Sequence, residues 1–169
     1  MIITKAKYED LDSIMEIVEK GRKQIASYGI DQWQSGTPNI NTFKNDLKLD
    51  RLYVLKDKNV EGVFACLNHD YSYDEIDGKW LEDSDYVAIH RVAVNQKGYG
   101  SILLTMLKQM YPHIRIDTHK GNIAMNKCLL KNNFTYCGII TLKDENGIIP
   151  KSLGGGERNA YEYLKKWCT

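Results

Sequence analysis

A glycine-rich turn joins an apolar stretch to the start of a predicted helix. The stretch YVAIHRVAV at 86–94 has the composition of a buried strand, and KGYGS at 97–101 leads into the apolar run SILLTMLKQMY. Glycines let backbone N–H groups approach a ligand closely, and a helix N-terminus adds unpaired donors and a positive dipole end. Such a turn can bind phosphate or pyrophosphate. A purely structural turn has the same composition, so this segment alone leaves both interpretations open.

Two better-known phosphate-binding patterns do not fit the turn. The dinucleotide fingerprint requires a third glycine and an early strand–helix–strand unit, and the sequence has neither. A P-loop requires Gly-Lys-Ser/Thr, which does not follow here. The interpretations left at this point are a structural turn and a turn that binds another kind of phosphorylated ligand.

His90 lies on the apolar strand that precedes the glycine-rich turn. An imidazole titrates near neutral pH, so His90 could remove a proton from a substrate directly or through a water molecule. The alternative is a histidine that fills a polar niche between the strand and a helix. The cysteines, Cys66, Cys128, Cys137 and Cys168, form no C-x-x-C pair and have no zinc-finger spacing with histidine. The sequence therefore predicts no metal site and no disulfide framework.

Periodicity predicts the elements that would position these residues. Strands are predicted at 1–7, 52–56, 60–67, 86–94, 114–118, 134–142 and 159–164. Helices are predicted at 10–28, 40–49, 101–111 and 122–132. The strand–helix–strand units of the second half imply parallel pairing, whereas the hairpins imply antiparallel pairing. The predicted fold class is α/β: a central mixed, mostly antiparallel sheet with helices on both faces.

Composition narrows the class of protein. A chain of 169 residues fits one domain, so 1–169 is predicted to form a single unit. Lys and Arg number 23 against 22 Asp and Glu, and this near-neutral balance argues against nucleic acid as a partner. The N-terminal segment MIITKAKYEDLD lacks a signal-peptide pattern, and no run is apolar enough to be a membrane span. We therefore expect a cytoplasmic protein.

Two segments resemble the motifs of a known family. HRVAVNQKGYGSILL resembles the acyl-CoA-binding motif of the GNAT superfamily of N-acetyltransferases, whose signature is Arg/Gln-x-x-Gly-x-Gly/Ala at the start of a helix. DTHKGNIAMNKCLLKNNF resembles the next strand and helix of that family, with Asn122 and Phe134 on its Asn and Phe. The order of the earlier elements agrees, so the resemblance covers essentially the whole chain. IDQW and IHRVAV look like a bacterial branch of unassigned substrate.

The resemblance implies acetyl-CoA as cosubstrate, with no metal. The cofactor-binding residues that it implies are Val92, Ala93, Val94, Lys97, Gly98, Tyr99, Gly100, Ser101, Asn122 and Lys127. Backbone groups of 92–94 would hold the pantetheine arm like an added strand, and a splay after that strand would expose an N–H to the thioester oxygen. The turn at 97–101 would hold the pyrophosphate, Asn122 would touch the pantetheine end, and Lys127 would reach the adenine end.

Several positions depart from the family pattern. Asn95 stands at the Arg/Gln position, Leu129 stands where many members carry a tyrosine acid, and Ala88 stands where many carry a carboxylate base. His90 is therefore the candidate base. Tyr136 is a candidate acid for the leaving thiolate, with a packing role as its alternative. A dedicated acid could also be unnecessary, because a thiol with a pKa of about 8.5 leaves readily as a thiolate.

The implied reaction is direct attack of a neutral amine on the thioester in a ternary complex. We expect a small-molecule or peptide amine as acceptor, no nucleic acid, no membrane, and a homodimer as one possible assembly. Gln32 and Trp33 lie on the loop where the family builds its acceptor site; Trp33 could face a cationic amine or simply anchor the loop. A catalytically silent acyl-CoA-binding module and a nucleotide-binding regulatory domain remain alternatives.

Overall fold

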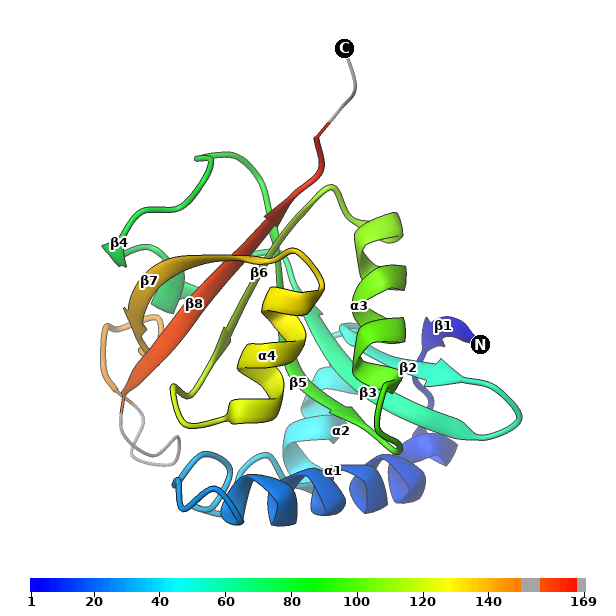
Figure 1. Cartoon of the computed structure of the whole chain (residues 1–169). Coiled ribbons are helices and arrows are strands. Elements are labelled where there is room, and N and C mark those ends of the chain that lie inside the picture. The colour runs from blue at the N-terminus through cyan, green and yellow to red at the C-terminus, as the bar shows by residue number, and fades with distance from the viewer. Residues whose placement is uncertain (150–155, 167–169) are drawn as a thin grey trace.

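The computed structural model describes residues 1–149 and 156–166 (Figure 1). Its strands are β1 (Ile2–Lys5), β2 (Leu52–Lys56), β3 (Val60–Leu67), β4 (Asp77–Gly78), β5 (Val87–Val94), β6 (His113–Thr118), β7 (Thr135–Thr141) and β8 (Glu157–Leu164). Its helices are α1 (Leu11–Ala26), α2 (Ile40–Lys48), α3 (Tyr99–Met110) and α4 (Ile123–Lys131), with short 3-10 turns η1 (Tyr8–Asp10) and η2 (Tyr71–Tyr73). Cys168 and most of the glycine-rich connection before the last strand lie outside the described residues.

The strands form one sheet in the order β1-β2-β3-β5-β6-β8-β7-β4. Among the described residues, β5 and β6 form its parallel pair and the other neighbours are antiparallel. The parallel pair arises because the crossover helix α3 returns the chain to the end of the sheet from which β5 started. The mixed, mostly antiparallel sheet predicted from the sequence is confirmed.

The sheet is split between its two parallel strands. Over the described residues, the ladder joining β5 to β6 consists of Val87 opposite Ile114 and Ala88 opposite Arg115. Beyond Ala88 the two strands diverge (Figure 1), while β5 stays paired with β3 as far as Val94. The splay expected after Val94 therefore begins within the strand, and it leaves one edge of β5 open.

Helices cover both faces of the sheet, as predicted. α1 and α2 pack on one face, where Val18 and Phe43 are fully buried among strand residues. α3 and α4 pack on the other face around Leu104 and Leu129. The buried residues of α1 recur at the helical spacing that identified it in the sequence: Leu11, Ile14, Ile17, Val18 and Ile25.

Strand β4 lies in the segment 69–84, which the sequence predicts to be irregular. Gly78 of β4 and Gly138 of β7 are paired, with φ angles of 141° and 139°. A Cβ at either position would lie 2.1 Å from a carbonyl oxygen of the opposite strand. This edge of the sheet therefore forms only because both residues are glycine.

Candidate active site

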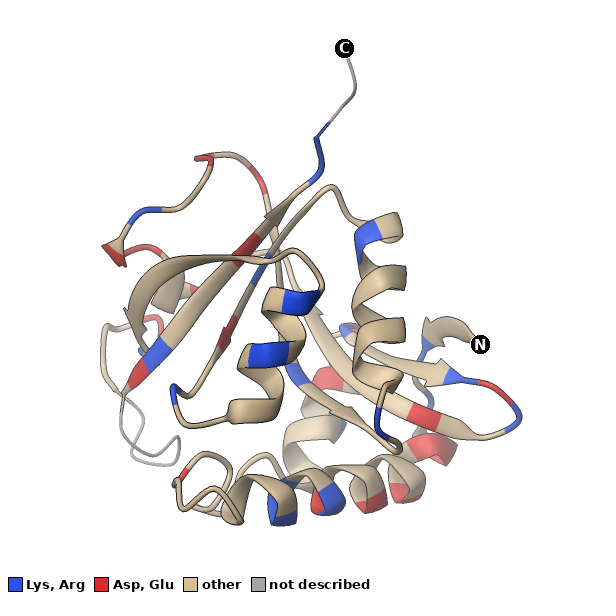
Figure 2. Ribbon diagram, viewed as in Figure 1, with Lys and Arg blue, Asp and Glu red and all other residues tan. Residues whose placement is uncertain are grey.

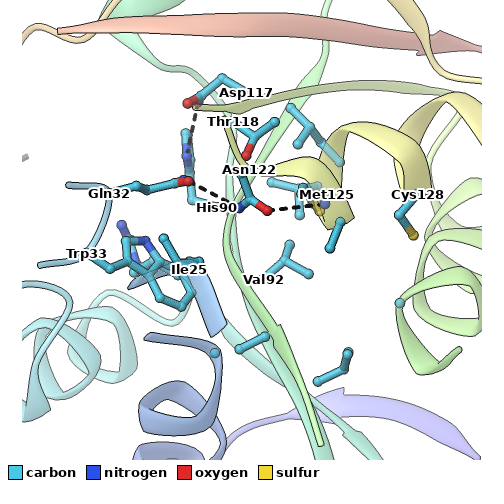
Figure 3. A pocket seen from close by; sticks show the side chains of 18 of the residues that line it. Ile25, Gln32, Trp33, His90, Val92, Asp117, Thr118, Asn122, Met125 and Cys128 are labelled. Atoms are coloured by element: carbon cyan, nitrogen blue, oxygen red, sulfur yellow. Dashed lines mark hydrogen bonds and ion pairs between the residues drawn. The ribbon is translucent and has the colours of Figure 1, made fainter. Parts of the chain in front are cut away.

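A cavity of about 1000 Å³ opens where β5 and β6 separate (Figure 3). Its walls come from β5, the first turns of α3 and α4, the end of α1 and the loop that follows α1. The lining includes twelve of the fourteen residues predicted for function: Gln32, Trp33, His90, Val92, Ala93, Val94, Lys97, Gly98, Gly100, Ser101, Asn122 and Lys127. The structure thus brings the candidate base, the glycine turn and the candidate acceptor loop to one cavity.

Strand β5 presents its open edge to this cavity. The segment 92–94 lies beyond Ala88, where β5 is paired with β3 on one side and has separated from β6 on the other. Such an edge offers backbone N–H and C=O groups to an extended ligand, which can add to the sheet as a strand would. The edge therefore suits a ligand that carries amide groups.

The glycine turn forms one end of the cavity. Gly98 is the N-cap of α3 with a φ of 93°, and a Cβ placed there would meet no described atom within 4 Å. α3 begins two residues earlier than predicted because Gly98, not Gly100, provides the cap. Lys97 and Lys127 line the cavity, and Figure 2 shows the basic segments of the turn and of α4. Helix N–H groups and two lysines together suit a phosphate group.

Asn95 occupies the position where the family signature has Arg or Gln, and its side chain is engaged by protein groups. Lys20 Nζ donates to Asn95 Oδ1 at 2.6 Å, and Asn95 Nδ2 donates to Glu61 Oε2 at 3.0 Å. These bonds tie the end of β5 to α1 and β3. The Asn95 side chain is therefore engaged within the protein, whereas Lys97 lines the cavity.

His90 lies between the carboxylates of Asp70 and Asp117, and Figure 3 shows it beside Asp117. Its Nε2 is 2.7 Å from Asp70 Oδ2, and its Nδ1 is 3.7 Å from Asp117 Oδ2. Tyr73 donates its O–H to the same Asp117 oxygen at 2.7 Å. The Asp70 contact is not aligned as a hydrogen bond, and Nε2 has no hydrogen-bond partner among the described residues. Charge on both sides therefore holds the imidazole in place.

The two carboxylates differ in how readily they take up a proton. Burial pushes the pKa of Asp70 upward, but the contact with His90 and the hydrogen bonds from Ser72 outweigh it and lower that pKa to about 2. Burial raises the pKa of Asp117, although the charge of His90 and the Tyr73 O–H oppose the rise. Burial and the charge of Asp117 raise the pKa of Tyr73, so the phenol remains a donor. His90 thus has one firmly ionised neighbour and one that is easier to protonate.

Asp70→Asn should destabilise the protein by about 2 kcal/mol at neutral pH, because the pKa of this carboxyl falls from 3.8 to about 2 on folding. A carboxyl with a lowered folded-state pKa adds stability above its ordinary pKa, and that stability is lost as the pH falls from about 4 to about 2. Urea unfolding of wild type and variant across this range measures the difference. A difference that persists unchanged at pH 2 would contradict the assignment.

Sequence reasoning did not identify either carboxylate. Asp70 stands in an irregular loop before η2, where no periodicity marks it. Asp117 carries a signal that depends on the register of β5 and β6, which are parallel with Val87 opposite Ile114. Three residues further along the two strands stand His90 and Asp117. The predicted parallel pairing did not fix this register, so the sequence alone did not place the carboxylate beside the histidine.

The loop after α1 reaches the start of α4. Asn122 Nδ2 donates to Gln32 Oε1 at 3.1 Å, and Asn122 Oδ1 accepts from the N–H of Met125 as the N-cap of α4 (Figure 3). Trp33 packs against α1, where its ring lies 3.4 Å from the place that a Cβ of Gly21 would occupy. Trp33 also lines the cavity, so the two roles considered for it, loop anchor and cavity wall, are compatible.

The remaining two predicted residues lie outside the cavity lining. Tyr136 on β7 is 47% exposed and packs edge-on against Tyr161, with ring centroids 5.6 Å apart. This placement favours the packing role over the role of acid. Tyr99 is the first residue of α3, and its backbone N–H donates to the carbonyl oxygen of Gln96 at 3.2 Å. Leu129 is fully buried in the core beneath α3 and α4, so its position supplies no acid.

The described cysteines are free thiols: Cys66, Cys128 and Cys137. Within residues 1–149 and 156–166, no group of histidine, cysteine and carboxylate side chains is arranged to hold a metal ion. In the same part of the chain, no helix combines the length and apolar character that crossing a bilayer requires.

Comparison with solved structures identifies the family. A GNAT-family acetyltransferase from Streptococcus agalactiae is 31% identical, with a TM-score of 0.85, over 98% of this chain and 96% of that one. A GNAT-family acetyltransferase from Bacillus cereus is 22% identical, with a TM-score of 0.59, over 98% of each chain. AAC(6')-Ib, solved with ribostamycin and coenzyme A, shares the fold at 15% identity and a TM-score of 0.63, over 96% of this chain and 92% of that one. No family model and no curated protein matches the sequence. At 31% identity over nearly the full length of both chains, the Streptococcus structure shows that this chain belongs to the GNAT family of acetyltransferases.

Proposed function

We propose that the protein transfers the acetyl group of acetyl-CoA to a primary amine by direct attack in a ternary complex. The observation that carries this proposal is the split sheet, in which one cavity joins an open strand edge, a basic glycine turn and His90 with its two carboxylates. The first two features suit an acyl carrier with amides and phosphates, and the third suits an amine that must lose a proton. The coenzyme A in the AAC(6')-Ib structure supports the choice of carrier.

The cavity offers a partner for each part of acetyl-CoA. The open edge at 92–94 would pair with the amides of the pantetheine arm. The N-terminus of α3 at 98–101 would hold the pyrophosphate, with Lys97 and Lys127 adding charge. Thr118 Oγ1 is buried, lines the cavity and has no partner within the described residues. An unsatisfied hydroxyl of this kind supports a polar ligand entering the split.

The groups around His90 would prepare the acceptor for attack. An ammonium group must lose a proton before its nitrogen can attack the thioester, and His90 would take that proton. Asp70, held ionised, would stabilise the imidazolium that forms, and the Asp117 carboxylate on the other side of the ring would add to this effect. The acceptor would reach His90 past Gln32 and Trp33, whose aromatic ring can face a cation.

The same strand would stabilise the charge that develops on the thioester oxygen. Backbone N–H groups on the open edge of β5 beyond Ala88 are fixed by the ladder to β3, so they need no reorganisation during the reaction. The leaving thiolate needs no dedicated acid, because a thiol of this type has a pKa of about 8.5. The burial of Leu129 and the exposure of Tyr136 both agree with a reaction that lacks such an acid.

The decisive experiment is an acceptor screen with detection of the released thiol. Purified protein and acetyl-CoA are incubated with amino acids, polyamines, aminoglycosides and peptides with free N-termini. Release of CoA that depends on the amine, together with an acetylated product found by mass spectrometry, supports the proposal. Thermal stabilisation by CoA without thiol release from any amine would instead identify a silent acyl-CoA-binding module. Displacement of CoA by ATP would favour the nucleotide-binding alternative.

A further inference from the structure

A β-bulge interrupts β5 beside the cavity. The two residues of β5 at 91–92 stand opposite the single residue of β3 between Val63 and Ala65. Arg91, the first of the two, has a φ of 55°. Glycine is the residue usually found at such a position, because a side chain disfavours the left-handed conformation. An interaction elsewhere must therefore hold Arg91 in this conformation.

Asp46 of α2 holds the side chain of Arg91. Arg91 Nε donates to Asp46 Oδ2 at 2.7 Å, and Arg91 Nη2 donates to Asp46 Oδ1 at 2.8 Å. Arg51 Nε donates to Asp46 Oδ1 at 2.7 Å as well. Asp46 is fully buried, so any movement of Arg91 would weaken the compensation of a charge that water cannot reach. The two-pronged pair therefore fixes the arginine and, through it, the backbone of the bulge.

The bulge determines which way the neighbouring side chains point. His90 pairs with Ala65 and Ala93 pairs with Val63, and directly paired residues share a face of the sheet. In a regular strand, residues 90 and 93 would point to opposite faces. The extra residue lets His90 face the carboxylates while 92–94 keeps its register with β3. Loss of the bulge would shift one of these segments by one residue and turn its side chains to the wrong face.

We infer that Asp46 is a positioning residue for acetyl transfer: by holding Arg91, it maintains the bulge that aligns His90 with the open strand edge. This inference rests on the proposed function, since that reaction is what the alignment would serve. Asp46 acts from the α2 side of the sheet and through another residue, so it is not itself a catalytic group.

A pair of substitutions at Arg91 tests the inference. Both Arg91→Gly and Arg91→Ala remove the ion pair, but only glycine takes the left-handed conformation without strain. We expect the kcat of Arg91→Gly to exceed that of Arg91→Ala about tenfold, because a left-handed alanine is disfavoured by roughly that factor. The KM for acetyl-CoA should differ less between them, within about threefold, since the glycine turn of α3 is unchanged. Equal kcat values in two folded variants would overturn the inference.

Substitution of the acid itself adds a rescue test. Asp46→Asn should lower kcat at least about tenfold, and adding Arg91→Gly should recover the kcat of Arg91→Gly alone, because the bulge then needs no ion pair. A further loss in the double variant would show that Asp46 only stabilises the fold. Lys56→Gln is the matched control: it breaks the Lys56–Asp10 pair of 2.8 Å, which joins β2 to η1, and should lower stability but not kcat. If Asp46→Asn does not fold, the comparison of Arg91→Ala with wild type by amide hydrogen exchange decides.

Amide hydrogen exchange separates this inference from the proposed function. Exchange at 89–94, measured without ligand, should be faster in Arg91→Ala, which lacks the ion pair, than in wild type. It should also be about tenfold faster than in Arg91→Gly, where the left-handed conformation needs no ion pair. This difference would support the role of Asp46 in holding the bulge even if wild type transferred no acetyl group to any amine, in which case only the proposed reaction would fail. Equal exchange in Arg91→Ala and wild type would overturn the role of the ion pair, whatever the turnover.

Discussion

Gly100→Asp should lower the affinity for CoA at least about tenfold, because it places a carboxylate where the pyrophosphate would meet the N-terminus of α3. A Cβ at this position would lie 3.3 Å from Cys128 Sγ, a tight contact that a small shift of the thiol would relieve. An acidic residue in the first turn of a helix is favourable, so the variant should fold. Titration calorimetry with CoA measures the loss.

Gly100→Asn is the matched control, since it has nearly the same size and no charge. It should lose clearly less affinity than Gly100→Asp, and the gap between the two should narrow as salt is added. Equal losses would mean that space alone, not phosphate charge, limits the site. A folded Gly100→Asp protein with wild-type affinity would show that the pyrophosphate lies elsewhere.

His90→Gln should lower kcat about a hundredfold or more, the range that removal of a general base usually costs. Glutamine keeps a polar side chain between Asp70 and Asp117 but cannot accept the proton of an ammonium group. In wild type, kcat/KM should rise with pH as the base loses its proton, and this acidic limb should be absent from the variant. A pH–rate profile with the best acceptor from the screen measures both effects.

Tyr136→Phe supplies the comparison for His90→Gln. The tyrosine is exposed on β7 and lies outside the cavity lining, so its loss should leave kcat within about threefold of wild type. If His90→Gln retained both the wild-type rate and the acidic limb of the pH–rate profile, His90 would not be the base. Proton transfer through a water molecule to a backbone carbonyl would then be the better account. A hundredfold loss in Tyr136→Phe, with CoA affinity intact, would make the tyrosine the acid.

The sequence predicts the regular elements of this fold well. The ranges of β2 and β3 agree with the prediction residue for residue, because each is an apolar run bounded by clear turn residues. β4 could not be predicted, since a two-residue strand with a glycine has no periodicity and depends on Gly138, sixty residues away in sequence. Periodicity in the sequence predicts helices and strands that bury one face. It does not predict a strand that forms because of a single contact with a residue distant in sequence.

Some residues of the candidate site can likewise be predicted from the sequence, and others cannot. The glycine turn and His90 lie on one continuous segment, so they could be found from spacing alone. The bulge could not, because Arg91 gives no sign of a left-handed residue, and the acid that holds it comes from α2. Asp70 likewise reaches the histidine from a separate loop. The sequence therefore predicts which segment carries the chemistry better than it predicts the surroundings that tune it.

The pairing of Gly78 with Gly138 bears on how readily this edge of the sheet would pair with a strand of another molecule. A sheet that ended at β7 would present a row of unsatisfied N–H and C=O groups, and such an edge recruits strands from other molecules. β4 covers part of that edge with a very short strand whose Asp77 adds a charge unfavourable to further pairing. Since a methyl group on either glycine would push β4 away, resistance to aggregation at this edge depends on two residues outside the cavity lining.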